Sequence, residues 1–456
     1  APPVEAAAQR PVHVLTLSAK TPEALEALAG RYERFLATHP DAELGDVCYT
    51  ANTGRSHFSH RLAVVAESCE ALRARLDAVV SAEVPAGAAI GQSVEAERLK
   101  TAFLFTGQGN ACAAMGRRLY ETQPAFRRTL ERCGELAASH LPVALIDVLY
   151  PENKNHYSIE DTIYAQPALF ALQCALYELW QSWGIAPSAV MGHSAGEYAA
   201  AWAAGVFSLE DGLKLVTARA RLMQALPAEF EKIARQVSYS PPRLGIVSPV
   251  AGGFVKEEIA TPGYWVRHIR QPVRFADGVK ALEQQGYSVF VELGPKPVLL
   301  AMARQSLLSK EAVLVPSLRE GSPDGSQLLS SLAELYVRGI PVDWQGFDRE
   351  YSRRKVALPT YPFQRRRYWI DKEKSPRTGR VVPTEGETSA IVNMLDKGET
   401  EQLAQIVTNE EYLSEDEKKL LPKILKTLVQ QHERHQKMVS LKDWLYEVRW
   451  PTRPRD

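Results

Sequence analysis

The sequence lacks a long hydrophobic run: none of its 456 residues lies in an apolar stretch of the roughly 18 residues that a transmembrane helix needs. It also lacks a net charge, because 54 lysines and arginines balance 54 aspartates and glutamates. A neutral chain argues against partnership with nucleic acid or an anionic membrane. No signal peptide is apparent. The chain begins with Ala1 rather than Met, so we expect a piece of a longer protein.

Paired cysteines and clustered metal ligands are also missing. The five cysteines are scattered, odd in number and never spaced as CxxC. This excludes a disulfide framework and predicts free thiols in a reducing, cytoplasmic setting. The ten histidines lack the spacing of metal ligands, so we expect no metal site.

What is present is an ordinary globular composition, 45% hydrophobic and 24% charged, in a length that suggests roughly two to four domains. VHVLTLS predicts a strand, followed by an N-cap at Thr21, Pro22 at the first helical position and a helix to about Leu36. HFSHRLAVVAES predicts a second strand and SCEALRARLDAVVSA a second helix. We expect this small α/β module to end near Ala82, before a Gly/Ala-rich connector from Ala86 to Glu97.

Strands and helices then alternate to about Leu318. AFLFTGQG, SAVM, YSVFVELGP and AVLVPS have the β-branched and aromatic residues of short buried strands, and YAQPALFALQCALYELWQSWG is typical of a long helix. This alternation predicts a largely parallel sheet flanked by helices.

The C-terminal quarter has a different character. Val356–Trp369, rich in proline and aromatic residues, predicts an extended strap over a neighbouring domain. After a polar linker, Ser414 and Glu417 have capping-box spacing at the start of a helix. Its apolar stripe either packs on its own domain or forms a dimer, and Asp443–Trp450 predicts a strand. The stripe consists of Leu421, Ile424, Leu425 and Leu428.

The stretch VMGHSAGEYAA places Ser194 between a predicted strand and a predicted helix. In a GxSxG turn the flanking positions are too crowded for side chains, which explains Gly192 and Gly196. The serine is pushed outward, and the helix N-terminus offers N–H groups to a developing oxyanion. Ser194 is therefore a candidate nucleophile.

A second glycine-rich turn, FTGQGNACAAMG from Phe105 to Gly116, also follows a predicted strand. Two such turns at the carboxyl ends of parallel strands would face one crevice. The segment matches neither GxGxxG nor a P-loop, so we expect no dinucleotide or nucleotide site.

The order of GQG, YAQPALFALQCAL, GHSAGE, RARLMQ, WVRHIRQPVRF and VELGPKPVL resembles that in malonyl-CoA:acyl-carrier-protein transacylases, most closely the acyltransferase domains of modular type I polyketide synthases. The flanks resemble the linker domain between ketosynthase and acyltransferase, the post-acyltransferase linker, and the dimerising helices and first strand before a ketoreductase. The resemblance implies no bound cofactor, with acyl-CoA, commonly malonyl-CoA, as substrate.

The resemblance implies that Ser194 takes the acyl group and passes it to the phosphopantetheine thiol of an acyl carrier protein. The backbone N–H groups of Gln108 and Ala195 match the oxyanion hole, and Arg219 matches the residue that pairs with the substrate carboxylate. His268 matches a position that supports the catalytic histidine, and His193 adjoins the nucleophile. Both histidines are candidate substrate-binding residues.

The catalytic histidine itself is missing from the sequence. In the family it lies in a small ferredoxin-like subdomain between segments that resemble RLMQALP and AEFEKIARQVSYSPP, which here join at about 227/228. No histidine lies between Ser194 and Arg267, and Ala111 replaces a glutamine usual in the GQG turn. Deletion by design, omission of a disordered part and natural loss all remain open. The polypeptide as written is expected to transfer acyl groups very poorly, because losing the base of a triad commonly costs several orders of magnitude in rate.

The expected fold class is α/β. We expect an acyltransferase large subdomain with a mostly parallel, hydrolase-like sheet, preceded by a small α/β linker domain and followed by a helical C-terminal segment.

Two other functions stay open: a non-catalytic docking module between ketosynthase and ketoreductase regions, and a hydrolase, since GxSxG also serves esterases. The expected domains are 1–98 (linker domain), 99–355 (large subdomain), 356–371 (post-acyltransferase linker), 372–440 (polar linker and helical segment) and 441–456 (start of the ketoreductase region).

Overall fold

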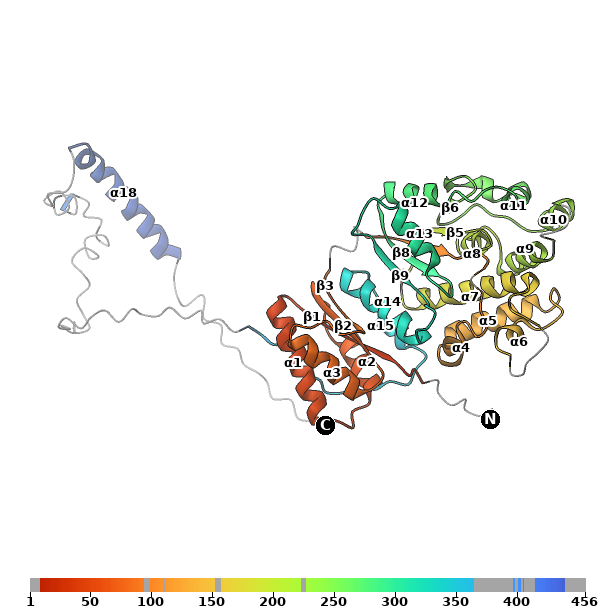
Figure 1. Cartoon of the computed structure of the whole chain (residues 1–456). Helices are drawn as coiled ribbons and strands as arrows, with labels where there is room; N and C mark the ends of the chain where they lie inside the picture. Colours follow the sequence, from red (N-terminus) through yellow and green to blue (C-terminus); the bar gives the residue numbers. More distant parts are fainter. Residues whose placement is uncertain are drawn as a thin grey trace, which may run out of the picture. The chain divides into compact units, whose positions relative to one another are not determined.

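A computed structural model describes residues 9–93, 99–109, 111–151, 157–222, 227–364, 397, 401–402, 405 and 415–438. The chain divides into two compact units, Ala1–Arg365 and Arg366–Asp456. Figure 1 shows the first unit as an α/β body in which colours from red to cyan follow the sequence.

The first unit begins with a small module built on a three-stranded antiparallel sheet of order β1-β2-β3. The strand and the helix predicted at its start are confirmed, including the N-cap, where the Thr21 side chain accepts a hydrogen bond from the Ala24 N–H. The elements are β1 (His13–Ala19), α1 (Pro22–Thr38), α2 (Leu44–Gly54), β2 (His60–Ala66), α3 (Cys69–Val80) and β3 (Ala88–Gln92).

The prediction of a plain connector over 86–97 was wrong, because β3 lies inside it. Its sequence AAIGQ is short and only partly buried, so it carries no clear alternating pattern. Pairing with β2, with Leu62 opposite Ile90, makes it a strand. Helix α2 also went unpredicted.

Both faces of this small sheet are covered. Leu15 and Leu17 of β1 face the core formed with α1 and α3, whereas Val14 and Val65 join the larger core of the unit. Helix α14 (Asp324–Arg338) packs against β2 and β3 and contributes Leu332 to that larger core. The small module therefore has a core of its own and also contributes residues to the larger core of the unit.

The larger sheet has six strands in the order β7-β6-β5-β4-β8-β9, parallel except for the edge strand β7. The predicted, largely parallel sheet is confirmed. The strands are β4 (Lys100–Phe105), β5 (Ala189–Gly192), β6 (Gly245–Ser248), β7 (Gly253–Val255), β8 (Tyr287–Leu293) and β9 (Val313–Pro316).

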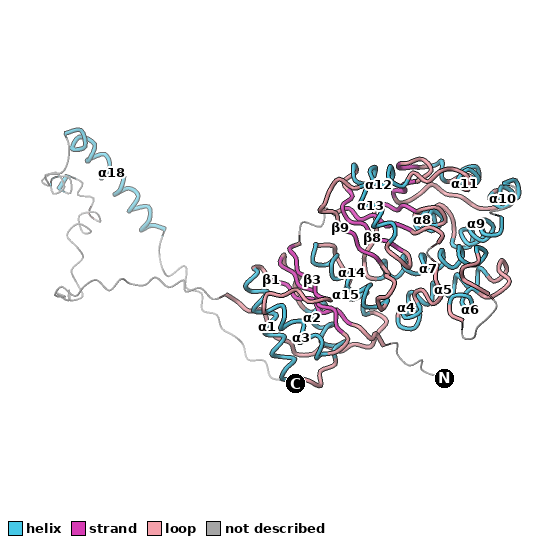
Figure 2. The backbone as a smooth tube through the Cα atoms, in the orientation of Figure 1, coloured by secondary structure: helices cyan, strands magenta, loops and turns pink. Residues whose placement is uncertain are grey.

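Helices cover both faces of this sheet (Figure 2). Phe103 and Phe105 of β4 pack into the core that includes α7, the predicted long helix, and Leu104 packs with α12 and α13 on the other face. Burial on both faces explains why the strands are continuous apolar runs. The three helices of this paragraph are α7 (Thr162–Ser182), α12 (Phe275–Gln284) and α13 (Val298–Ser306).

Most of the remaining helices of the first unit lie between these strands in the sequence, whereas α15 follows the last strand and packs on α2. Those along the first half are α4 (Arg117–Thr122), α5 (Pro124–Ala137), α6 (Leu145–Leu149), α8 (Gly196–Ala203) and α9 (Leu209–Leu222). Those along the second half are α10 (Pro227–Ala234), the 3-10 turn η2 (Glu257–Ile259), α11 (Pro262–His268) and α15 (Trp344–Asp348).

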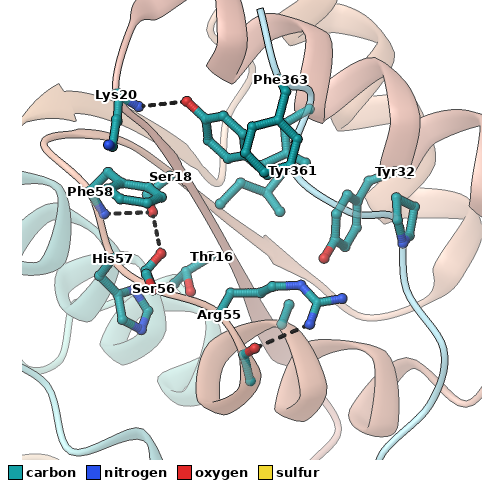
Figure 3. Close-up of a pocket in the computed structure, with 15 residues that line it drawn as sticks. Thr16, Ser18, Lys20, Tyr32, Arg55, Ser56, His57, Phe58, Tyr361 and Phe363 are labelled. Carbon is teal, nitrogen blue, oxygen red and sulfur yellow. Dashed lines mark hydrogen bonds between the residues drawn. The ribbon is translucent and has the colours of Figure 1, made fainter. Parts of the chain in front are cut away.

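The described part of the predicted strap, residues 356–364, has no regular helix or strand and crosses the small module. The Lys20 N–H donates to the Tyr361 hydroxyl at 3.1 Å, and Arg31 donates to the Thr360 carbonyl at 3.1 Å. Figure 3 shows Tyr361 and Phe363 above a cavity of about 390 Å³ bounded by β1 and α1. The expected extended strap over a neighbouring module is confirmed for these residues.

The second unit contains the predicted C-terminal helix, α18 (Glu415–Met438). Ile424 and Leu428 are about half exposed, at 53% and 50%, and Val429 is buried. Ser414, the polar linker and the strand predicted at Asp443–Trp450 lie outside the described residues. Over the described ranges, no helix combines the length and apolarity needed to cross a membrane.

Candidate active site

Ser194 lies at the sharp turn between β5 and α8. Its backbone φ is 51°, in the left-handed region that a residue with a Cβ rarely occupies. Its side chain is half-buried rather than enclosed. This is the strand–turn–helix geometry that the GxSxG pattern predicted.

The two glycines of the pattern are required by close backbone approach. A Cβ on Gly192 would lie 2.3 Å from the Glu197 Cα, and a Cβ on Gly196 would lie 2.2 Å from the Phe105 carbonyl oxygen. Both distances are far below van der Waals contact. The flanks of Ser194 can therefore hold only glycine while this turn keeps its shape.

The second glycine-rich turn lies beside the first, as expected from the sequence. The His193 N–H donates to the Phe105 carbonyl at 2.9 Å, and a Cβ on Gly107 would lie 2.6 Å from the His193 carbonyl oxygen. Within the described part of the chain, neither the Gln108 N–H nor the Ala195 N–H has an acceptor.

Arg219 reaches this turn from the last part of α9. It is 5% exposed, and its Nη2 donates to the Ser194 Oγ at 3.1 Å. The structure therefore brings together two residues that the resemblance assigned to one site. A guanidinium 3.1 Å from a hydroxyl can hold a carboxylate beside the same oxygen, because it presents several donors in one plane.

A buried glutamine that the sequence analysis did not single out completes this arrangement. Gln166, on α7, accepts a hydrogen bond from Arg219 Nη1 through its Oε1. Its Nε2 donates to the Gln108 Oε1 at 2.9 Å, and the Gln108 Nε2 donates to the Thr162 Oγ1 at 3.3 Å. The available signal was its place in the YAQPALFA segment, one of the motifs that carry the resemblance.

His268 lies in a different, buried cluster. Its Nε2 is 3.0 Å from the Glu197 Oε2, and the two side chains are 2% and 0% exposed. Tyr264 donates to the other oxygen of Glu197 and also contacts the Ser248 hydroxyl. This cluster ties the first turn of α8 to α11 and to the end of β6.

Among the described residues, the His193 side chain contacts Phe275 and Gly107 rather than Ser194. Its ring packs edge-on against Phe275 with centroids 5.9 Å apart, and its Nδ1 lies against Gly107. Burial lowers the pKa of His193, and the nearby His268 lowers it further. The described residues pair the Ser194 Oγ with Arg219 and with no histidine or carboxylate.

Comparison with known families supports the acyltransferase relationship. Residues 102–239 and 229–342 match the family described as "Acyl transferase domain", and residues 13–76 match "CurL-like, PKS C-terminal". The chain is 31% identical to polyketide synthase GfsA of Streptomyces halstedii over 79% of its own length and 6% of that protein. It is 33% identical to the PKS-NRPS hybrid synthetase ATPKS of Aspergillus niger over 78% of its length and 24% of that protein. It thus spans less than a quarter of these relatives.

Solved structures agree with the sequence matches. The acyl transferase domain of ZmaA superposes with a TM-score of 0.72 at 26% identity, covering 78% of this chain and 100% of that domain. The acyltransferase domain from module 8 of the salinomycin polyketide synthase has a TM-score of 0.65 at 28% identity, with coverages of 75% and 99%. These matches favour an acyltransferase over the docking module and the hydrolase. The chain belongs to the acyl transferase domain family, in the form found in type I polyketide synthases.

Proposed function

We propose that Ser194 takes a malonyl group from malonyl-CoA as an acyl-enzyme and passes it to the phosphopantetheine thiol of an acyl carrier protein. The observation that carries this proposal is the hydrogen bond from Arg219 to the Ser194 Oγ. A cation beside the nucleophile favours an acyl group whose far end is a carboxylate. A plain acyl group has no carboxylate to offer the guanidinium.

The acylation step uses groups from both turns. The Ser194 Oγ attacks the thioester carbonyl and loses its proton to a base from solution, and the carbonyl oxygen becomes an oxyanion. The N–H groups of Gln108 and Ala195 then stabilise that oxyanion. The C–S bond breaks and the CoA thiolate leaves, and the carrier-protein thiol reverses the sequence to take the malonyl group.

The proposal also holds that the chain as written is a poor catalyst, because it lacks the small subdomain that supplies the base in the family. The family match falls into two pieces that meet at 229–239, next to the junction at about 227/228. The 444 positions aligned with GfsA contain only 79% of this chain, about 360 residues, so the rest are positions that the relative has and this chain lacks. We therefore expect slow acylation by the chain as written.

The partners follow from the same proposal. The relatives are multidomain synthases, so an acyl carrier protein and neighbouring ketosynthase and ketoreductase domains are the expected contacts. Helix α18, with Ile424 and Leu428 half exposed, is the proposed dimerising element.

Intact-protein mass spectrometry with and without malonyl-CoA tests the proposal. The untreated protein should have the mass of this sequence, 50.6 kDa, and should slowly gain one malonyl group that is absent in Ser194→Ala. A heavier untreated protein would show that a subdomain is hidden from this sequence. A matching mass with Ser194 unmodified after prolonged incubation would leave the docking module as the better description.

A further inference from the structure

We infer that Gln166 is a positioning residue: it holds Arg219 in its acid-binding orientation and links that arginine to the Gln108 turn. The inference rests on the proposed function, because it concerns how the site prefers a carboxyacyl group. Gln166 lies on α7 and is 0% exposed. A buried amide needs hydrogen-bond partners.

The orientation of the Gln166 amide follows from its partners. An arginine can only donate hydrogen bonds, so the atom facing Arg219 must be the carbonyl oxygen of Gln166. The NH₂ group is then directed to the Gln108 Oε1, 2.9 Å away. This in turn directs the Gln108 NH₂ to the Thr162 hydroxyl. The three hydrogen bonds thus form one chain, in which Arg219 donates to Gln166, Gln166 donates to Gln108 and Gln108 donates to Thr162.

A neutral amide suits this position better than a carboxylate would. A carbonyl oxygen accepts from the guanidinium without cancelling its positive charge, which stays available to an incoming carboxylate. A glutamate at 166 would form an ion pair with Arg219 and could not donate to Gln108. A methionine would keep the volume but make neither hydrogen bond.

The second link reaches the oxyanion side of the site. The backbone N–H of Gln108 has no acceptor among the described residues, and its side chain is fixed at both ends by Gln166 and Thr162. The Gln166 amide therefore holds two groups of the site by one hydrogen bond each. Arg219 is proposed to bind the carboxylate of a malonyl group, and the Gln108 turn is proposed to bind its thioester oxygen. We therefore expect substitution of Gln166 to change the preference for malonyl-CoA over acetyl-CoA more than it changes folding.

The test is the ratio of affinities for malonyl-CoA and acetyl-CoA. Calorimetry on the full chain carrying Ser194→Ala prevents acylation from distorting the binding. In that background, Gln166→Glu should weaken malonyl-CoA binding by about tenfold or more, the scale of one hydrogen bond to a charged group. The loss of acetyl-CoA affinity should be clearly smaller, because acetyl-CoA has the thioester oxygen but no carboxylate for Arg219. Gln166→Met should weaken malonyl-CoA binding by a smaller factor.

A matched control lies on the same helix. Gln181→Glu makes the same chemical change about 22 Å along α7, at a rise of 1.5 Å per residue, and should leave both affinities as they were. Far-UV circular dichroism and thermal unfolding of each variant report whether it is folded.

The outcomes separate the inference from the function on which it rests. If the parent chain shows no preference for malonyl-CoA, the proposed carboxyacyl function fails. If the parent prefers malonyl-CoA and folded Gln166→Glu keeps that preference, only the inference fails. If neither Gln166 variant folds, its role is structural and the inference is overturned.

Discussion

Arg219 Nη2 donates a hydrogen bond to the Ser194 Oγ at 3.1 Å, across 25 positions of the sequence. A guanidinium stabilises negative charge on that oxygen, but it cannot accept a proton, since its pKa lies above about 12. The described site therefore holds a group that favours the alkoxide and no group that would take its proton. We therefore expect acylation of Ser194 to depend on a base from solution.

We predict that imidazole accelerates the malonylation of Ser194 by at least about tenfold, because a general base typically contributes a factor of 10² to 10⁴. The half-buried Ser194 side chain leaves a path for a small base. The measurement is the rate of adduct formation from malonyl-CoA by intact mass, at rising imidazole and fixed pH and ionic strength. Ser194→Ala should give no adduct. Fast acylation without imidazole would show that a base is already present.

Gly196→Ala should disrupt the turn. The new Cβ would lie 2.2 Å from the Phe105 carbonyl and 2.4 Å from that of Thr106, and both are backbone atoms of the neighbouring turn. We expect a loss of about 3 kcal/mol or more in the free energy of unfolding, at the upper end for overpacked sites. Urea denaturation measures it.

Gly253→Ala is the matched control for this prediction. Its Cβ would meet nothing within 4 Å, and Gly253 lies on the edge strand β7. Its unfolding free energy should stay within about 0.5 kcal/mol of the parent. Equal losses in the two variants would mean that the contact between the turns is not what restricts position 196.

Removing the His268 side chain should cost stability rather than chemistry. His268→Ala removes the ring nitrogen that lies 3.0 Å from the buried Glu197 Oε2, and leaving a buried polar group without its neighbour typically costs about 1 to 3 kcal/mol. A double-mutant cycle with Glu197→Gln should return most of that loss as coupling energy. If His268→Ala keeps its stability but loses the imidazole-assisted labelling of Ser194, His268 belongs to the reacting groups instead.

The sequence predicted those parts of the fold that local patterns determine. The strand before Ser194, its two flanking glycines and the N-cap at Thr21 each follow from steric or hydrogen-bonding rules that act within a few residues. Strand β3 escaped prediction because its identity depends on pairing with β2 across the sheet. Propensity alone does not encode such a contact.

The same distinction applies to the site. Ser194, Gln108 and Arg219 stand in recognisable motifs, so their grouping could be expected from the resemblance. Gln166 and Glu197 also stand in those motifs, but their roles depend on side chains from distant elements. Only the fold shows that Glu197 lies against His268, and that Gln166 lies between Arg219 and Gln108.

Acid should destabilise the protein through His13. Burial, with the positive charges of Arg10 and Arg353, lowers the pKa of His13 to about 3. In the unfolded chain this histidine binds a proton below about pH 6.5, whereas in the folded chain it resists one until about pH 3. Stability should therefore fall as pH drops through that window, with a limiting slope of about 1.4 kcal/mol per pH unit.

Urea unfolding at pH 7 and at pH 5 measures this loss in the free energy of unfolding. The parent protein should lose about 1 kcal/mol more than His13→Gln between the two pH values, since partial exposure of His13 reduces the limiting value. A parent slope in His13→Gln would locate the acid sensitivity elsewhere.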